Sequence, residues 1–107
     1  APAVDVIPLS VEAAPAAVRL ARRLREHGMR CELEAAGRSL KSAMRRADKL
    51  AARFAVLIGE DELRAGRATV RDLQRKADHP LALPVDAPAD ALATTLDGLA
   101  ASGGQGG

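Results

Sequence analysis

Apolar and polar residues follow a strand, helix, strand pattern in the first third of the chain. Residues 4–9 are mainly β-branched or apolar and predict a first strand, which Pro8 and Ser10 end. Within residues 12–27, apolar positions recur at helical spacing and arginines fill positions between them, which predicts an amphipathic helix. Residues 29–34 alternate between apolar and polar side chains, as expected of a second strand.

A second helix and a continuous apolar run follow. Ser39 is a good N-cap for a helix that runs to about Leu50. The predicted buried stripe of this helix consists of Leu40, Ala43, Met44, Ala47 and Ala51. Residues 54–58 are apolar throughout, which is typical of a central strand covered on both faces. The alternation of strands and helices predicts parallel strands joined by right-handed crossovers.

The pattern changes after residue 58. Residues 60–65 predict a short helix that Gly66 ends. Residues 67–73 alternate as a strand and place Ala68, Val70 and Asp72 on one side.

The last part of the chain predicts a hairpin and one more helix. A polar turn over residues 75–78 leads to a last strand around residues 81–85. Asp86 and Pro88 would open the final helix, which brings Leu92, Thr95, Leu96 and Leu99 to one face.

Composition limits the class of protein. With 107 residues, the chain is expected to form one domain with an aliphatic core, since Phe54 is its only aromatic residue. Cys31 is the sole cysteine, so no internal disulfide can form, and we expect it to be buried in a strand in a cytoplasmic protein. No window approaches the roughly 18 apolar residues of a membrane span, which predicts a soluble chain with no membrane partner. Because it begins with Ala1 rather than Met, we expect a piece of a longer protein.

The residues needed for catalysis are scarce. The chain holds two His, four Ser and one Cys, and no catalytic triad, HExxH, Walker A or GxGxxG spacing occurs. His27 lies at a predicted helix end and His79 in a predicted turn, so we expect both at the surface. The sequence therefore predicts no catalytic residue in this chain.

Three successive carboxylates follow the central apolar run, in the stretch Gly59-Glu60-Asp61-Glu62. A hard cation needs several oxygens arranged around it, whereas successive residues of a helical turn point in different directions. Acidic residues in a first turn are instead stabilised by the helix dipole. We therefore expect no metal site here and assign the cluster mainly to the start of a short helix.

Positive charge gathers in the segment 38–53, which carries six Lys or Arg against Asp48 alone. Arg38, Lys41 and Arg45 are expected on one flank of the second helix, because steps of three and four residues stack side chains on one face. Such a cluster can be a solvated face or can hold phosphates of a nucleic acid.

Two residues beyond this cluster suit contact with bases. A carboxylate such as Glu62 can accept from a base amino group, and an arginine such as Arg71 can bind a guanine edge or stack on a base.

Several motifs resemble a known family. The stretches VIPL (residues 6–9), LREHGMRCEL (24–33), GRSLKSAMRRADKLAARFAVLIGEDEL (37–63) and AGRATVRDL (65–73) resemble the C-terminal anticodon-binding domain of histidyl-tRNA synthetase, a class II aminoacyl-tRNA synthetase. The resemblance implies a single three-layer α/β domain over residues 1–102, followed by a flexible Gly-rich tail over 103–107. Its mixed five-stranded sheet would combine three parallel strands with a C-terminal hairpin and carry three main helices.

The resemblance also implies a function. Such a domain recognises the anticodon of histidine tRNA, while a separate catalytic domain of the parent ligase joins histidine to the tRNA with ATP and Mg. This chain would need no cofactor, and its parent would be a cytoplasmic homodimer that serves protein biosynthesis. Glu62 and Arg71 correspond to positions that contact anticodon bases in related synthetases, and Arg38, Lys41 and Arg45 would add phosphate contacts.

Two departures and two alternatives accompany the resemblance. Arg71 stands where the histidyl pattern usually has Lys, and QRKADHP (residues 74–80) replaces a shorter turn, which puts the register of the last hairpin in doubt. A synthetase-like paralogue domain used for protein interaction or regulation would keep the fold without anticodon selectivity. A doubly wound nucleotide binder is disfavoured because the chain lacks a phosphate loop.

Overall fold

The computed structural model describes residues 3–82 together with Leu96 and Gly98. The strands are β1 (Val4–Pro8), β2 (Cys31–Leu33), β3 (Phe54–Ile58), β4 (Arg67–Asp72) and β5 (Ala77–Ala82). The helices are η1 (Val11–Ala13), α1 (Ala14–Glu26), α2 (Leu40–Leu50) and α3 (Glu60–Ala65). The predicted final helix and the predicted tail lie outside the described residues apart from Leu96, which is buried in the core, and Gly98.

The five strands form one mixed sheet in the order β2-β1-β3-β4-β5. Strands β2 and β3 both run parallel to β1, whereas β4 is antiparallel to β3 and β5 is antiparallel to β4. This arrangement confirms the predicted three parallel strands followed by a hairpin.

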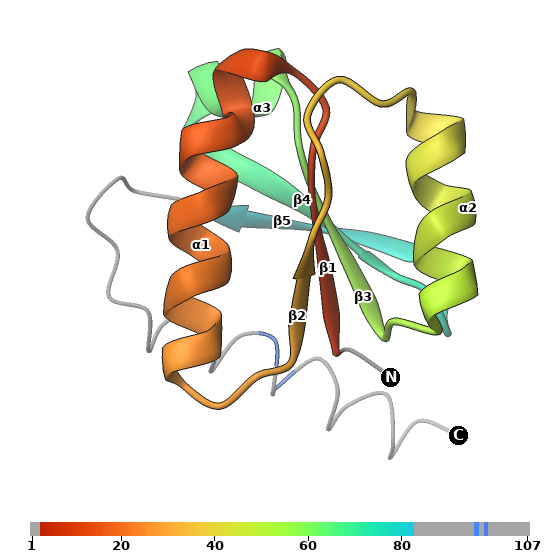
Figure 1. The fold of residues 1–107 in the computed structure, drawn as a ribbon. Helices are drawn as coiled ribbons and strands as arrows, with labels where there is room; N and C mark the ends of the chain where they lie inside the picture. The colour runs from red at the N-terminus through yellow and green to blue at the C-terminus, as the bar shows by residue number, and fades with distance from the viewer. Residues whose placement is uncertain (1–2, 83–95, 97, 99–107) are drawn as a thin grey trace.

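Helices cover the two faces of the sheet, so the domain has three layers. Figure 1 shows α1 on one side of the strands and α2 on the other. The side chains of Val4 and Val6 join α1 in the larger apolar cluster, whereas Ile7 packs with Ala43 and Ala47 of α2 in the smaller one. Because side chains alternate along a strand, β1 and β3 contribute to both clusters.

Local signals fix the ends of α2. The Ser39 hydroxyl accepts from the backbone N–H of Ser42 at 3.1 Å, as predicted for an N-cap. At the other end Ala51 adopts a left-handed conformation with φ 55°. The predicted buried stripe was wrong at two positions, since Leu40 is 44% exposed and Ala51 is exposed. Both lie at the ends of the helix, beyond the sheet residues that cover Ala43 and Ala47.

The last strand begins earlier than the sequence predicts. Residues 81–85 were expected, but β5 starts at Ala77, and the turn that precedes it spans residues 73–76. Pro80 and the polar residues around it suggested a turn. They fit here because β5 is an edge strand, where one side of the backbone has no ladder partner and proline is tolerated.

Two further predictions concern burial. Cys31 is buried in β2 as expected. Glu34, a polar position of the predicted second strand, is buried at 6% exposure, whereas Glu32 and Arg30 are exposed. Among the described residues, no helix is long and apolar enough to cross a membrane.

Candidate RNA-binding surface

The outer side of α2 presents a group of cations, which we call the α2 basic surface: Arg38, Lys41 and Arg45. Lys41 and Arg45 lie one helical turn apart, and Arg38 directly precedes the N-cap Ser39. All three side chains are exposed, and no carboxylate in the described part of the chain forms an ion pair with them. The α2 basic surface is therefore available to an anionic ligand.

Two other cations of the basic segment have structural partners. Arg46 Nε donates to Glu34 Oε1 at 2.6 Å. Arg53 Nη2 donates to Asp72 Oδ2 at 2.9 Å, and its guanidinium lies 5.1 Å from the centre of the Phe54 ring. The predicted patch thus separates into cations that hold the fold together and cations that face solvent.

Glu62 lies in the first turn of α3, where its carboxylate folds back over the helix start. A Cβ placed on Gly59 would approach Glu62 Oε2 to 3.1 Å. This direction resembles the capping arrangement in which the third helical residue returns to the N-cap. Glu62 is half-buried, whereas Glu60 and Asp61 are exposed. Of the three carboxylates in the cluster, Glu62 is the least exposed, and Asp61 accepts from Arg64 Nη2 of the same helix at 3.0 Å.

Arg71 is held by a carboxylate that the sequence did not identify. Its Nε and Nη2 donate to the two oxygens of Asp78 at 2.8 and 3.1 Å. Arg71 and Asp78 stand directly opposite each other on β4 and β5. This hydrogen bonding raises the pKa of Arg71 and lowers the pKa of Asp78, so both groups are charged at neutral pH. Because the predicted strand began after residue 80, sequence reasoning could not pair the two.

The structure places Arg71 on the same face of the sheet as α2. Arg71 pairs with Ala55 of β3, whose side chain belongs to the apolar cluster under α2. Glu62 follows the end of β3, so Arg71 lies about 10 Å of strand away from that end, at roughly 3.3 Å per residue. Within the described residues no hydrogen bond joins Glu62 to Arg71. The structure thus places Arg71 on the α2 face of the sheet and Glu62 in α3 beyond the end of β3, with no hydrogen bond between them in the described part of the chain.

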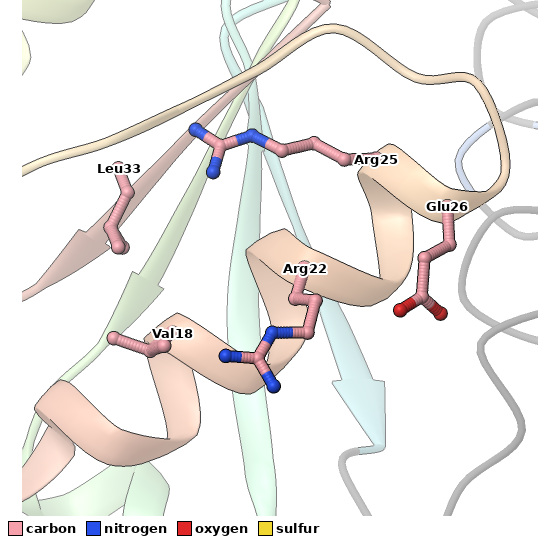
Figure 2. Close-up of a pocket in the computed structure, with 5 residues that line it drawn as sticks. All are labelled: Val18, Arg22, Arg25, Glu26 and Leu33. Atoms are coloured by element: carbon pink, nitrogen blue, oxygen red, sulfur yellow. The ribbon is translucent and has the colours of Figure 1, made fainter.

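A separate pocket lies beside α1, where the α2 basic surface does not reach. Figure 2 shows its lining residues Val18, Arg22, Arg25, Glu26 and Leu33, which surround an open space of about 420 Å³. Arg25 is tied to the protein, since its Nη2 donates to the Cys31 carbonyl at 2.8 Å. In the described part of the chain, no group of three His, Cys, Asp or Glu side chains is placed to hold a metal ion.

Comparison with known proteins identifies the family. The sequence profile of the family described as "Anticodon binding domain" matches residues 3–94, most of the chain. The chain belongs to the anticodon-binding domain family. The anticodon-binding domain is 48% identical to the histidine–tRNA ligase of Pelobacter propionicus over 67 residues, which cover 63% of this chain and 16% of that protein.

Solved structures agree with this assignment. Histidyl-tRNA synthetase from a Nostoc species superposes with a TM-score of 0.76 at 27% identity, over 90% of this chain and 21% of that one. The RNA binding domain of threonyl-tRNA synthetase from Cryptosporidium parvum has a TM-score of 0.73 at 19% identity, over 89% of this chain and 22% of that one, and shows the shared fold alone.

The chain corresponds to a small part of each curated relative. The chain spans 16% to 20% of the length of the first curated relatives that it matches. The predicted resemblance is therefore confirmed: this is an anticodon-binding domain of the histidyl-tRNA synthetase type, and the matched region is a small part of those ligases.

Proposed function

We propose that this anticodon-binding domain binds the anticodon loop of histidine tRNA. The observation that carries the proposal is the α2 basic surface, whose three cations have no carboxylate partner among the described residues and lie on the side of the sheet that carries Arg71. Cations of this kind hold phosphates and position an RNA without regard to sequence.

Base selection is assigned to Glu62 and Arg71. The Glu62 carboxylate can accept a hydrogen bond from an exocyclic amino group. Arg71 uses two of its five N–H groups on Asp78, so three donors stay available for a base edge. Asp78 then acts as an orienting partner, because it fixes the plane of the guanidinium before RNA arrives.

The same proposal covers the parent protein. A separate catalytic domain would bind ATP and Mg and join histidine to the tRNA, in a cytoplasmic homodimeric ligase. The names of the curated relatives support this part, since they are histidine–tRNA ligases. No residue of the described chain is assigned to that chemistry.

A binding comparison tests the function. The chain is titrated into a labelled anticodon stem-loop with the anticodon GUG and into a second stem-loop with these bases permuted, and fluorescence anisotropy is measured at several salt concentrations. We expect tighter binding of GUG, and a dissociation constant for the isolated domain near the nonspecific range of roughly 10⁻⁴ to 10⁻⁶ M. Equal affinity for both RNAs would remove the specificity, and absence of binding to either would favour the paralogue used for protein interaction.

A further inference from the structure

A buried carboxyl group lies on the face of the sheet that α2 covers. Asp5 is the second residue of β1 and is 0% exposed. Its neighbours Val4 and Val6 face α1, so the alternation of the strand turns Asp5 toward α2. Neither oxygen of Asp5 receives a hydrogen bond from any donor in the described part of the chain. An ionised carboxylate with no donor is costly in such a position.

The residue that faces Asp5 is a second buried carboxyl group. The side chain of Glu34 is 4% exposed, and its Oε1 accepts from Arg46 Nε at 2.6 Å. Its Oε2 also lacks a donor among the described residues. The backbone N–H of Glu34 donates to the Val6 carbonyl at 2.9 Å, which fixes this residue beside β1.

The charges around Asp5 do not balance if both carboxyls are ionised. Glu34 and Glu32 act on it from the β2 segment and Arg46 from α2, while β3 presents the apolar Ala55 opposite. Two buried carboxylates would then share one guanidinium. A single proton between Asp5 and Glu34 removes the excess charge and supplies the missing hydrogen-bond donor.

We propose that Asp5 and Glu34 hold one proton between them and that this proton, through Glu34 and Arg46, keeps α2 seated on the sheet. Asp5, Glu34 and Arg46 are thus positioning residues for the α2 basic surface. The first part of the proposal concerns the fold alone, whereas an effect on RNA binding rests on the proposed function.

The protonation of Asp5 sets the direction of the pH effect. Burial, followed by the hydrogen bond that a protonated Asp5 makes with Glu34 and by the charge of Glu34, raises the pKa of Asp5 to about 8 from an ordinary value of 3.8. The folded chain therefore holds a proton that the unfolded chain releases between these two values. The stabilisation is complete below about pH 4 and is lost as the pH rises toward 8. One such proton changes the unfolding equilibrium constant by up to about tenfold per pH unit.

Unfolding measurements test the shared proton. The chain is unfolded with urea at pH values from 5 to 9, together with Asp5→Asn and the control Glu12→Gln, an exposed carboxylate in η1 that does not act on Asp5. We expect the urea midpoint of the wild-type chain and of Glu12→Gln to fall between pH 5 and 8, and that of Asp5→Asn to stay nearly constant. A flat wild-type profile, or an unchanged slope in Asp5→Asn, would overturn the proposal.

A second measurement needs no variant. The ¹³C resonance of the Asp5 carboxyl carbon should titrate near pH 8 in the wild-type chain, and a titration near pH 4 would overturn the proposal even if Asp5→Asn failed to fold. Above pH 8, amide protection factors in α2 should fall more than those in α1. Equal loss in both helices would show that the proton stabilises the whole fold and not α2.

RNA binding completes the test. The affinity for the GUG stem-loop should drop at least about threefold between pH 6.5 and 8.8 in the wild-type chain, and by less in Asp5→Asn. If stability falls with pH as expected but the affinity for RNA does not change with pH, the proposed link between the shared proton and the α2 basic surface is wrong. If stability falls with pH as expected but the RNA does not bind even at pH 6.5, the proposed function is wrong and the proposal of a shared proton is retained.

Discussion

At the scale of single residues, the candidate surface contains two kinds of cation. Arg71 is oriented by two hydrogen bonds to Asp78, so its guanidinium meets a ligand in a fixed plane. Lys41 and Arg45 have no such partner in the described chain and retain the freedom of long side chains. A guanidinium group held in one plane is suited to recognise one base edge, whereas cations on freely rotating side chains can bind phosphates at many positions.

We predict that Arg71→Lys reduces selectivity more than affinity. Lysine keeps the positive charge but lacks the planar fork that Asp78 orients. The preference for GUG over the permuted stem-loop should fall by about 1 to 3 kcal/mol, while the salt dependence of binding stays the same. Anisotropy titrations with both RNAs measure this, and an unchanged preference would show that Arg71 reads no base.

We predict the opposite effect for Lys41→Ala. Loss of one phosphate contact should weaken binding to every RNA alike and lower the slope of log K against log salt by about 0.7 to 0.9. Arg22→Ala is the matched control, since Arg22 is an exposed cation on α1 at the other face of the sheet. Similar slopes for Lys41→Ala and Arg22→Ala would argue against binding through α2.

At the scale of elements, α2 depends on its cap and β4 on a buried ion pair. The Ser39 hydroxyl satisfies one backbone N–H at the start of α2. Asp72, at the end of β4, accepts from the N–H groups of Gln74 and Arg75 at 3.0 Å each and from Arg53 at 2.9 Å. Asp72 therefore connects the start of β3 to the turn before β5.

We predict that Ser39→Ala lowers the free energy of unfolding by about 1 kcal/mol, because the first turn of α2 loses its cap. Urea unfolding measures the change. Ser42→Ala is the control, since the Ser42 side chain is exposed and only its backbone N–H takes part in the cap. An equal effect of the two substitutions would contradict a specific role for the cap.

We predict that Asp72→Asn lowers the free energy of unfolding by about 1 to 3 kcal/mol at pH 7, because Arg53 loses its charged partner. Burial alone would raise the pKa of Asp72, but the N–H groups of Arg75 and Gln74 and the Arg53 guanidinium together lower it. A lowered pKa stabilises the fold above the ordinary value of 3.8, and this contribution is lost as the pH falls through the folded pKa. The difference in the free energy of unfolding between wild type and variant should thus vanish in strong acid. A difference that does not change with pH would show that the Asp72 charge is not its cause.

At the scale of the whole molecule, the rate at which the Cys31 thiol reacts reports how often the fold opens. Burial raises the pKa of its thiol, which Arg25 partly offsets, and the residue is 9% exposed. We predict that a thiol reagent modifies it more slowly in the folded chain than in urea by more than about three orders of magnitude, as a stability of roughly 5 kcal/mol or more implies. A chain with Cys31→Ala and Ser42→Cys should react rapidly under both conditions. Rapid reaction of native Cys31 would instead reveal local opening of β2.

The sequence predicted the parts of this domain that depend on local signals. The cap at Ser39 and the apolar strand β3 lie where periodicity and capping residues place them. The start of β5 was wrong because Pro80 resembles a turn residue unless the strand is known to lie at an edge, which depends on long-range pairing. Contacts between distant segments also depend on long-range pairing. The alternation of apolar and polar residues along the chain does not show that Glu34 is buried near Asp5, or that Asp78 lies opposite Arg71.

The bond from Arg25 to the Cys31 carbonyl has a consequence for solubility. Strand β2 is the outer strand next to β1. The Arg30 carbonyl and the Glu34 N–H bond to β1, and the backbone groups of successive residues face alternate sides of a strand, so the Cys31 carbonyl points away from the sheet. A free carbonyl there would invite another chain to add a strand and begin an aggregate. The Arg25 guanidinium occupies it at 2.8 Å, and Pro80 interrupts the ladder at the opposite edge. Each edge strand of the sheet thus has a feature that hinders pairing with a strand of another chain.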